Sequence, residues 1–409
     1  MDLTPEHHRM LDGDYGKATR KAIQILVTLG DIYSAQRLVP VSSVQVAGVS
    51  YDNLGEAGLH FLSEMADSGG QARVFTTLNP AGMDIENWQV LGIDPGFVDS
   101  QQRVLDAFAK MGIVTTCSCT PYLVGNVPHY GENIAWAESS AVCYANSVFG
   151  ARTNREGGPS ALASALTGYT AEYGLHLAHA RRPEITVEVH AELVDTMDYG
   201  AFGKTLGEQL VHAGGKLTPY IQGVSQVPLE QLKSFCASLA TYGGIALFHM
   251  EGITPEASSY SPPAKKISIG NREINVAKQS MQGGDDDEVD FISLGCPHLS
   301  LPEIARIAEL LRGQRVDKEF WITTARPIKQ IADRMGYTAV IEASGAKFAA
   351  DTCCVVAPLK GRFKVMATDS AKACYYAQTK NRFRTVFRPF DEIVQLAIAG
   401  GHVEQGGKA

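Results

Sequence analysis

Cysteine offers the most chemistry in this chain, because a thiolate can act as a nucleophile or bind a metal. The chain has eight cysteines and no recognisable export signal, so we expect free thiols. Cys143, Cys236 and Cys374 fall among small apolar residues in expected helices, which predicts buried side chains with a packing role. The informative cysteines lie in expected loops: Cys117, Cys119, Cys296, Cys353 and Cys354.

Cys119, Cys296 and Cys353 share one context, because each ends or follows an expected strand. Ligand sites of α/β sheets gather at the carboxyl ends of strands. Three dispersed thiols at such ends suggest an iron–sulfur cluster with one iron lacking a protein ligand, but their spacing alone favours buried, inert thiols. The chain has no Cys-x2-Cys pair, which disfavours a zinc knuckle or a ferredoxin-type cluster.

Two of these positions have a second cysteine nearby. Cys353 and Cys354 are adjacent, so in an extended chain they face opposite sides and only one is expected to bind iron. Cys117 and Cys119 would share one face of a regular strand, so their spacing does not separate them.

Two loops have the composition of anion sites. Residues 154–160 contain Arg155 and a Gly-Gly-Pro run before an Ala/Leu-rich helix, whose first backbone N–H groups favour an anion. Residues 368–372 open another helix and add a lysine charge. Ordinary N-capping by Ser160 and Ser370 is the alternative. Neither loop is a Gly-x-Gly-x-x-Gly or Walker motif, so nucleotide binding has no support.

Helical and strand periodicities alternate along the chain, which predicts an α/β fold of parallel or mixed sheets covered by helices. Ser300 and Glu303 have capping-box spacing for one helix. Helices are expected at 17–35, 55–66, 98–110, 132–149, 301–311, 327–335, from 370 and at 391–399, and strands at 38–46, 72–78, 113–117, 186–194, 289–294, 320–324, 353–357 and 365–368.

The length of 409 residues predicts two or three domains. We expect an N-terminal α/β region at 1–251, with room for two subdomains, and a C-terminal α/β domain at 290–399. An irregular connecting segment at 252–289, with a hairpin near 270–271, would join them, and a frayed tail would follow at 400–409.

Composition excludes several classes of protein. A hydrophobic fraction of 45% and a charged fraction of 20% are typical of a folded globular chain. The net charge of −8 argues against nucleic-acid binding, which needs a basic face. No apolar stretch is long enough to predict a membrane span, and the start has no basic or apolar leader, so we expect a cytoplasmic protein.

Short strings spread over nearly the whole chain together resemble the large subunit of the aconitase X family. They are Pro-Val-Ser-Ser-Val-Gln at 40–45, Gly-Val-Ser at 48–50, Thr-Leu-Asn-Pro-Ala-Gly at 77–82, Cys-Thr-Pro-Tyr at 119–122, residues 131–139 and 151–155, Gly-Cys-Pro-His at 295–298 and Asp-Thr-Cys at 351–353.

The resemblance implies an aconitase-like arrangement of α/β domains around a central iron–sulfur site. It places the metal ligands at Cys119, Cys296 and Cys353, with Cys117 and Cys354 as bystanders. The expected cofactor is a [4Fe-4S] cluster with one open iron, although a [2Fe-2S] cluster or a mononuclear iron would use the same thiols. The residues implied to line the substrate site are Gly48, Val49, Ser50, Asn79, Pro80, Glu138, Ser139 and Lys372, with Arg155, Ser160 and Ser370 from the two loops as further anion contacts.

The implied mechanism is a Lewis-acid dehydration, in which the open iron binds the hydroxy acid while a base removes a proton from the carbon beside the carboxylate. In aconitases that base is a serine on a smaller swivelling domain. This chain has no room for such a domain after the helix at 391–399. We therefore expect a separate small subunit to supply the base in a heteromeric enzyme.

The 154–160 loop resembles the branch of the family that dehydrates (R)-mevalonate 5-phosphate to trans-anhydromevalonate 5-phosphate, a step of a modified mevalonate pathway to isoprenoids. A substrate with a carboxylate and a phosphate needs two anion sites, which this loop and the start of the helix at 370 could provide. The alternative enzyme is a cis-3-hydroxy-L-proline dehydratase. An alternative of another class is a non-catalytic or regulatory iron-binding protein on the same scaffold.

Overall fold

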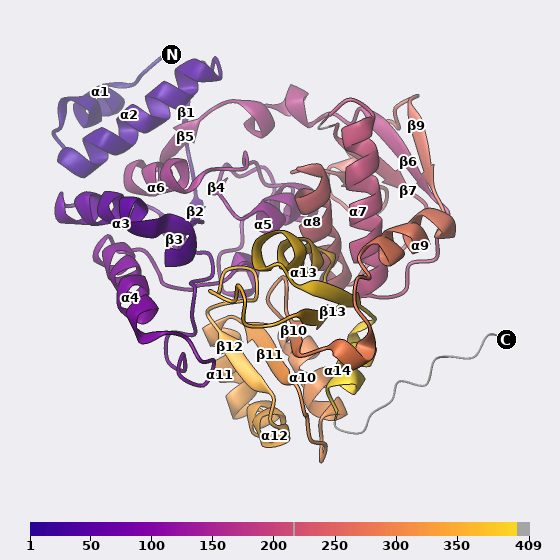
Figure 1. Ribbon diagram of the computed structural model, residues 1–409. Coiled ribbons are helices and arrows are strands. Elements are labelled where there is room, and N and C mark those ends of the chain that lie inside the picture. Colours follow the sequence, from indigo (N-terminus) through magenta and orange to yellow (C-terminus); the bar gives the residue numbers. More distant parts are fainter. Residues whose placement is uncertain (216, 399–409) are drawn as a thin grey trace.

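The computed structural model describes residues 1–215 and 217–398. In Figure 1 the N-terminal, middle and C-terminal parts of the chain form three regions that meet around α5 (Ser139–Tyr144), α8 (Leu229–Gly243) and α13 (Ala371–Tyr376). Among the described residues, no helix has both the length and the apolar character needed to cross a membrane. The tail expected at 400–409 lies outside the described residues.

The first region is built on the parallel sheet β3-β2-β4, with strands Phe75–Leu78, Ser43–Val46 and Ala135–Trp136. Every residue of β2 is buried, as expected for the central strand of a parallel sheet covered by helices. The remaining elements are α1 (Pro5–Asp12), α2 (Lys17–Ile32), α3 (Tyr51–Asp67), α4 (Pro95–Lys110), α6 (Gly158–Thr167) and the antiparallel pair β1 (Leu38–Pro40) and β5 (Tyr169–Ala171).

The middle region holds the parallel sheet β8-β7-β6-β9, with strands His249–Met250, Pro219–Gln222, Ile185–Val189 and Lys266–Ile269. Its helices are α7 (Thr196–His212), α8 and α9 (Asn271–Ser280). The backbones of α7 and α8 are so close that a Cβ on Gly207 would lie 2.7 Å from the Gly243 nitrogen. Only glycine fits at this contact.

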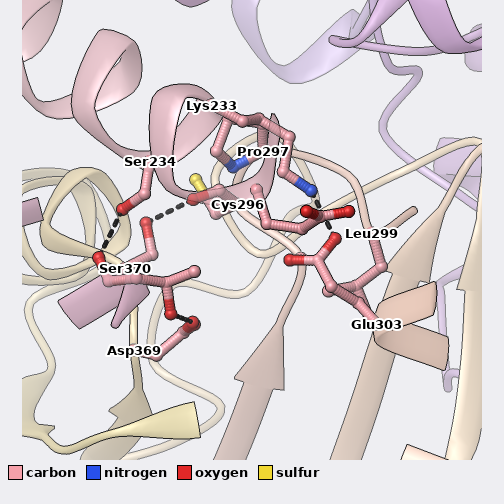
Figure 2. A pocket seen from close by; sticks show the side chains of 11 residues that line it. Lys233, Ser234, Cys296, Pro297, Leu299, Glu303, Asp369 and Ser370 are labelled. Carbon is pink, nitrogen blue, oxygen red and sulfur yellow. Dashed lines mark hydrogen bonds and ion pairs between the residues drawn. The ribbon is translucent and has the colours of Figure 1, made fainter. Parts of the chain in front are cut away.

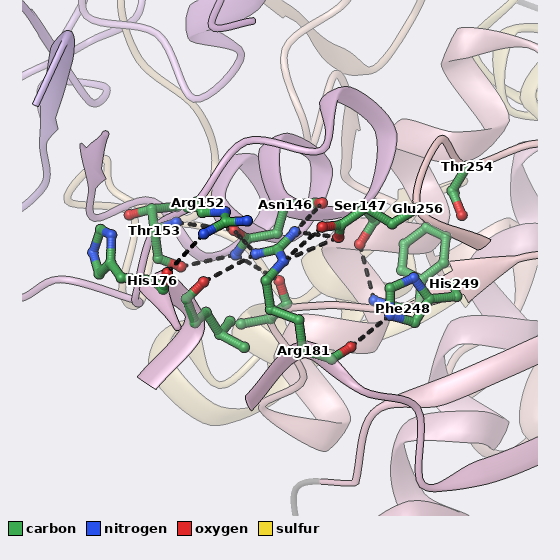
Figure 3. A network of polar contacts seen from close by, with 12 residues as sticks. Asn146, Ser147, Arg152, Thr153, His176, Arg181, Phe248, His249, Thr254 and Glu256 are labelled. Carbon is green, nitrogen blue, oxygen red and sulfur yellow. Dashed lines mark hydrogen bonds and ion pairs between the residues drawn. The ribbon is translucent and has the colours of Figure 1, made fainter. Parts of the chain in front are cut away.

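A buried ion pair fixes the middle region to the first (Figure 3). Arg181 is fully buried, and its guanidinium lies 2.6 Å from the carboxylate of Glu256. The same guanidinium donates to the backbone oxygen of Asn146 at 2.9 Å. All of its charge is therefore matched inside the protein, which a buried arginine requires.

The third region is the parallel sheet β12-β11-β10-β13-β14, with strands Lys347–Ala350, Glu319–Thr324, Phe291–Leu294, Val365–Thr368 and Arg384–Phe387. Helices α10 (Leu301–Leu310), α11 (Arg326–Arg334), α12 (Tyr337–Ser344), α13 and α14 (Phe390–Ala397) accompany it. The predicted capping box of α10 is confirmed, because Ser300 N–H donates to Glu303 at 2.7 Å and the Ser300 hydroxyl caps the Glu303 N–H. The predicted α/β class is confirmed as well.

Strand order reverses once in the first sheet and once in the third. From β2 the chain adds β3 on one side and then β4 on the other. From β10 it adds β11 and β12 on one side, and then β13 and β14 on the other. Crevices outside the carboxyl ends of strands at such reversals are the usual ligand sites of open α/β sheets.

Several elements differ from the sequence-based expectation. Residues 132–149 are not one helix, because β4 pairs with β2 before α5 begins, and a π-helical turn (Ala145–Phe149) follows α5. The segment 252–289, expected to be irregular with a hairpin, instead contains β9, which pairs with β6, and α9. The strands expected at 113–117 and 353–357 are absent from the described residues; Cys117 has φ 44° and the chain turns after β12.

Candidate active site

The reversal points of the first and third sheets lie against each other. The Ser50 hydroxyl, after β2, donates to the backbone oxygen of Val356 at 2.8 Å. The carboxylate of Glu138, after β4, lies 2.5 Å from the ammonium of Lys372, after β13. Segments that are distant in the sequence therefore meet where both sheets place their carboxyl ends.

An arginine strengthens the same contact between the two regions. Arg326, at the start of α11, lies 2.5 Å from carboxylate oxygens of both Asp84 and Asp351. Burial raises the pKa of Asp351 to about 6 although the Arg326 charge opposes this shift. The two aspartates come from different regions, so the arginine holds the loop before Cys353 against the first region.

The three cysteines expected to bind iron lie at this contact. In the third region, Cys296 follows β10 and Cys353 follows β12. Cys119 belongs to the first region, where the backbone N–H of the preceding residue, Ser118, donates to the backbone oxygen of Leu78 in β3. Their exposed fractions are 6%, 9% and 5% for Cys119, Cys296 and Cys353. The three thiols are therefore buried, and each comes from a separate loop.

The charge of Cys353 affects the pKa of both other thiols, which indicates that the three are neighbours. Burial raises the pKa of Cys119 well above its usual value, and the neighbouring Cys353 adds to the increase. Burial raises the pKa of Cys296 to about 12, with Lys372 opposing and Cys353 adding to the shift. Burial also raises the pKa of Cys353, while the backbone N–H groups of Val355 and Val356 and the charge of Lys372 lower it. A metal that replaced the protons would relieve this burial cost.

The neighbouring cysteines have different surroundings. Cys117 is fully buried in the hydrophobic core of the first region, and burial and Asp351 raise its pKa. Cys354 belongs to a second apolar cluster, which also contains Cys296, so packing alone does not separate these two thiols. The cysteines expected to have a packing role, Cys143, Cys236 and Cys374, are fully buried in the core of the middle region.

The residues at this contact have the chemistry that an iron–sulfur group requires. In the described part of the chain, no set of three or more His, Cys, Asp or Glu side chains is arranged around a single ion. Thiolates of a polynuclear cluster bind different irons, so they stand farther apart than the ligands of one ion. The Thr352 hydroxyl, beside Cys353, is buried without a partner in the described protein and is a donor for a bound group. Three convergent thiols and an orphaned hydroxyl fit a cluster.

His298 contacts the loops of two of these cysteines. Its backbone N–H donates to Cys119 Sγ at 3.2 Å, and its Nε2 lies 3.0 Å from the backbone oxygen of Thr352. Burial lowers the pKa of the imidazole to about 4, so the ring is neutral at ordinary pH. The place of this histidine between the cysteine loops is not visible in the sequence.

Glu138 and Lys372 form a buried ion pair between the two sheets. Burial alone would raise the pKa of Glu138, but the charge and hydrogen bond of Lys372 outweigh it and the pKa is lowered. Burial alone would lower the pKa of Lys372, and Glu138 reverses this shift. Asn79 donates to the second Glu138 oxygen at 3.0 Å, and Gln45 donates to Asn79 at 3.3 Å. Both charges are therefore fixed in place.

The other residues expected at the substrate site follow strands β2, β3 and β4. Gly48 is exposed with φ 80°, a conformation that favours glycine, and Val49 is buried beneath it. Ser139, the first residue of α5, is half-buried, and Pro80 is buried next to Asn79. Of the predicted residues, Asn79, Glu138 and Lys372 contact one another, and the others stay a prediction.

The two predicted anion loops differ in what they offer. Arg155 is exposed, and its charge joins that of Lys372 in lowering the pKa of Tyr376, which burial raises overall. The Ser160 hydroxyl is buried and donates to Glu156 at 2.6 Å. The Ser370 hydroxyl donates to the backbone oxygen of Cys296 and caps α13. Both hydroxyls have protein partners, so Arg155 is the side chain of these loops best placed to meet an anion.

Charged residues that the sequence analysis did not select line a small pocket beside Cys296 (Figure 2). Lys233 of α8 lies 2.5 Å from Glu303 and donates to the His298 oxygen at 2.9 Å. Burial raises the pKa of Asp369 in the same pocket to about 6. The available sequence signals were a lysine among the apolar residues of α8 and a glutamine, Gln45, between two valines in β2.

Comparisons with known proteins agree on one family. The sequence models for the aconitase X first, second and third domains match residues 1–179, 183–279 and 289–399. The phosphomevalonate dehydratase large subunit of Methanocaldococcus jannaschii is 43% identical over 97% of this chain and 100% of that protein. The crystal structure of Thermococcus kodakarensis aconitase X (holo-form) matches with a TM-score of 0.90 and 42% identity, over 96% of this chain and 99% of that one. A cis-3-hydroxy-L-proline dehydratase of Pseudomonas aeruginosa is 32% identical over 96% of this chain and 69% of its own length.

Proposed function

Because this chain belongs to the aconitase X family, we propose that it is the large subunit of a phosphomevalonate dehydratase. The observation that carries the proposal is the 43% identity to such a subunit over the full length of that relative. The reaction is removal of water from (R)-mevalonate 5-phosphate to give trans-anhydromevalonate 5-phosphate. The chain is then a hydro-lyase subunit of isoprenoid biosynthesis by a modified mevalonate pathway.

Aconitase X enzymes are iron–sulfur hydro-lyases, and we assign the ligands to Cys119, Cys296 and Cys353. Their mutual effects on pKa, and the place of Cys117 in the apolar core of the first region, support this choice. The choice of Cys353 over Cys354 rests on the family motif, because Cys354 shares its apolar cluster with Cys296. When bound, a [4Fe-4S] cluster with one open iron would supply a Lewis acid for the departing hydroxyl. The backbone N–H of His298 would donate to the Cys119 thiolate, as it does to its sulfur here.

The charged residues of the site have distinct proposed roles. Lys372 is matched by Glu138, so it positions rather than attracts the substrate. Arg155 and the first backbone N–H groups of α6 are suited to the phosphate. The Glu138 carboxylate is stabilised by Lys372, Asn79 and Ser140, which makes it a weak base. This supports a proton acceptor outside the chain.

We propose that a small subunit completes the site and brings the base. The M. jannaschii relative is named a large subunit, and this chain spans only 69% of the P. aeruginosa enzyme. The remaining length of that enzyme would correspond to the separate subunit here. A cytoplasmic location stays a prediction.

The decisive experiment is an anaerobic assay of this chain with and without the small subunit, on (R)-mevalonate 5-phosphate and on cis-3-hydroxy-L-proline. We expect water loss from the phosphorylated substrate only when both chains are present. Turnover of hydroxyproline alone would favour the second enzyme, which the 32% identity to the P. aeruginosa protein keeps as an alternative. Iron without either activity would favour a non-catalytic iron-binding protein.

A further inference from the structure

We propose that His298 is the positioning residue that holds the three cysteine loops in register, so that iron retention depends on a side chain that does not bind iron. The proposal rests on the ligand set of the proposed function. It concerns how the ligands are kept together, which the ligand assignment itself leaves open.

His298 reaches each of the three loops through a different group. It lies two residues after Cys296, so it belongs to that loop. Its backbone N–H donates to Cys119 Sγ at 3.2 Å, which joins the first region. Its Nε2 lies 3.0 Å from the oxygen of Thr352, the residue before Cys353. One residue therefore connects the three chain segments that carry the thiols.

The direction of the imidazole hydrogen bond is fixed by its partner. A backbone carbonyl can only accept, so Nε2 of His298 carries the proton and donates to Thr352. His298 is fully buried, and water does not compete for this bond. Among the hydrogen bonds of the described residues, the His298 ring is the only donor to the Thr352 oxygen. The position of the loop before Cys353 therefore depends on this side chain.

The residue is itself anchored from the opposite side. The His298 oxygen accepts from the ammonium of Lys233 at 2.9 Å. Lys233 is held by Glu303 at 2.5 Å, and Glu303 accepts the Ser300 N–H at the start of α10. His298 is therefore connected to α8 and α10 as well as to the cysteine loops. Because these contacts hold its backbone in place, the backbone cannot move to restore the hydrogen bond to Thr352 when the side chain is changed.

Removing the imidazole would leave the buried Thr352 oxygen without its donor and free the loop of Cys353. Residues that orient metal ligands typically change metal affinity by about ten- to a hundredfold. We expect His298→Leu to release iron about ten- to a hundredfold faster than the unchanged chain. His298→Gln keeps an amide donor at similar reach and should stay within about threefold of it.

His249 provides a matched control (Figure 3). It is also fully buried, its Nε2 lies 2.7 Å from a backbone oxygen, that of Arg181, and its Nδ1 likewise has no partner among the described residues. It belongs to β8 of the middle region, away from the cysteine loops. His249→Leu should therefore weaken resistance to urea as His298→Leu does, while iron release stays at the unchanged rate.

The experiment isolates the two-subunit complex of each variant without oxygen, and measures iron and acid-labile sulfide per chain. It then measures the rate of iron transfer to a coloured chelator, with the urea midpoint alongside. Equal release rates for His298→Leu and the unchanged chain would overturn the inference, as would fast release from a folded His298→Gln. If the leucine variant does not fold, His298→Asn, whose shorter amide cannot reach Thr352, takes its place. If the protein without substitutions contained no iron after anaerobic isolation, that result would instead refute the proposed cluster.

Discussion

Replacing Lys372 by methionine should destabilise the protein, because it leaves the Glu138 carboxylate buried without its counter-charge. The side chains of Glu138 and Lys372 are only 11% and 9% exposed, and their charged atoms are 2.5 Å apart. Removing one member of such a pair typically costs about 3–5 kcal/mol. A lysine that only contacted substrate would cost about 1.5–3 kcal/mol in binding or rate and leave unfolding unchanged. The effect on unfolding therefore distinguishes a lysine of the buried pair from one that only contacts the substrate.

The assay is urea unfolding of the anaerobically isolated complex, followed by tryptophan fluorescence. Glu138→Gln in the Lys372→Met background should recover most of the loss, because the pair is then replaced by neutral groups and Asn79 can still donate to the new amide oxygen. Lys110→Met is the matched control, since its pair with Asp67 has side chains that are 59% and 71% exposed, and it should change the midpoint little.

Two results would refute this reasoning. An unchanged urea midpoint for Lys372→Met would mean that the buried pair does not stabilise the fold. Additive losses in the double variant, in place of recovery, would mean that the two residues act separately.

Three further outcomes are expected. Serine in place of any one of the three proposed iron ligands should abolish iron retention measured after anaerobic isolation, whereas serine at Cys117 or Cys354 should leave most of it. Arg155→Ala should raise KM for the phosphorylated substrate about ten- to a hundredfold, without moving the urea midpoint, if the exposed guanidinium meets the phosphate; an unchanged KM would exclude that contact. Burial raises the pKa of Glu156 above 4.5, so the folded state holds its proton longer and this carboxyl destabilises the fold increasingly as pH rises from about 4.5. Glu156→Gln cannot ionise, so its urea midpoint relative to the unchanged chain should rise as pH increases above about 4.5, until Glu156 is ionised in the folded protein as well. A difference independent of pH would contradict the cause given.

The elements that could be predicted from sequence are those with strong local signals. The capping box at Ser300 and Glu303 marks the start of α10 correctly, and alternating periodicities give the α/β class. The two-residue strand β4 was missed because its neighbours have helical spacing, and only pairing with β2 makes it extended. Tertiary pairing decided the conformation there against the local pattern.

Some features of the candidate site could likewise be predicted from the sequence, and others could not. Cysteine and glycine strings at strand ends are visible in the sequence, and the structure brings them together. The pairing of Glu138 with Lys372 cannot be seen in the sequence, because 234 positions separate the two residues and no local rule relates them. The placement of His298 depends likewise on which loops meet across two sheets. Residue types can be identified locally, but their partners are set by the docking of separate regions.

The opposed reversal points of the first and third sheets also set an order of events during synthesis. Cys119 leaves the ribosome well before Cys296 and Cys353, and neither region alone holds all three thiols. The site therefore forms only after the last strands of the third sheet have folded and docked on the first region. Any group bound by all three thiols would add its binding free energy to the docking of these regions. Loss of that group should then appear first as separation of the third region from the first, before either unfolds.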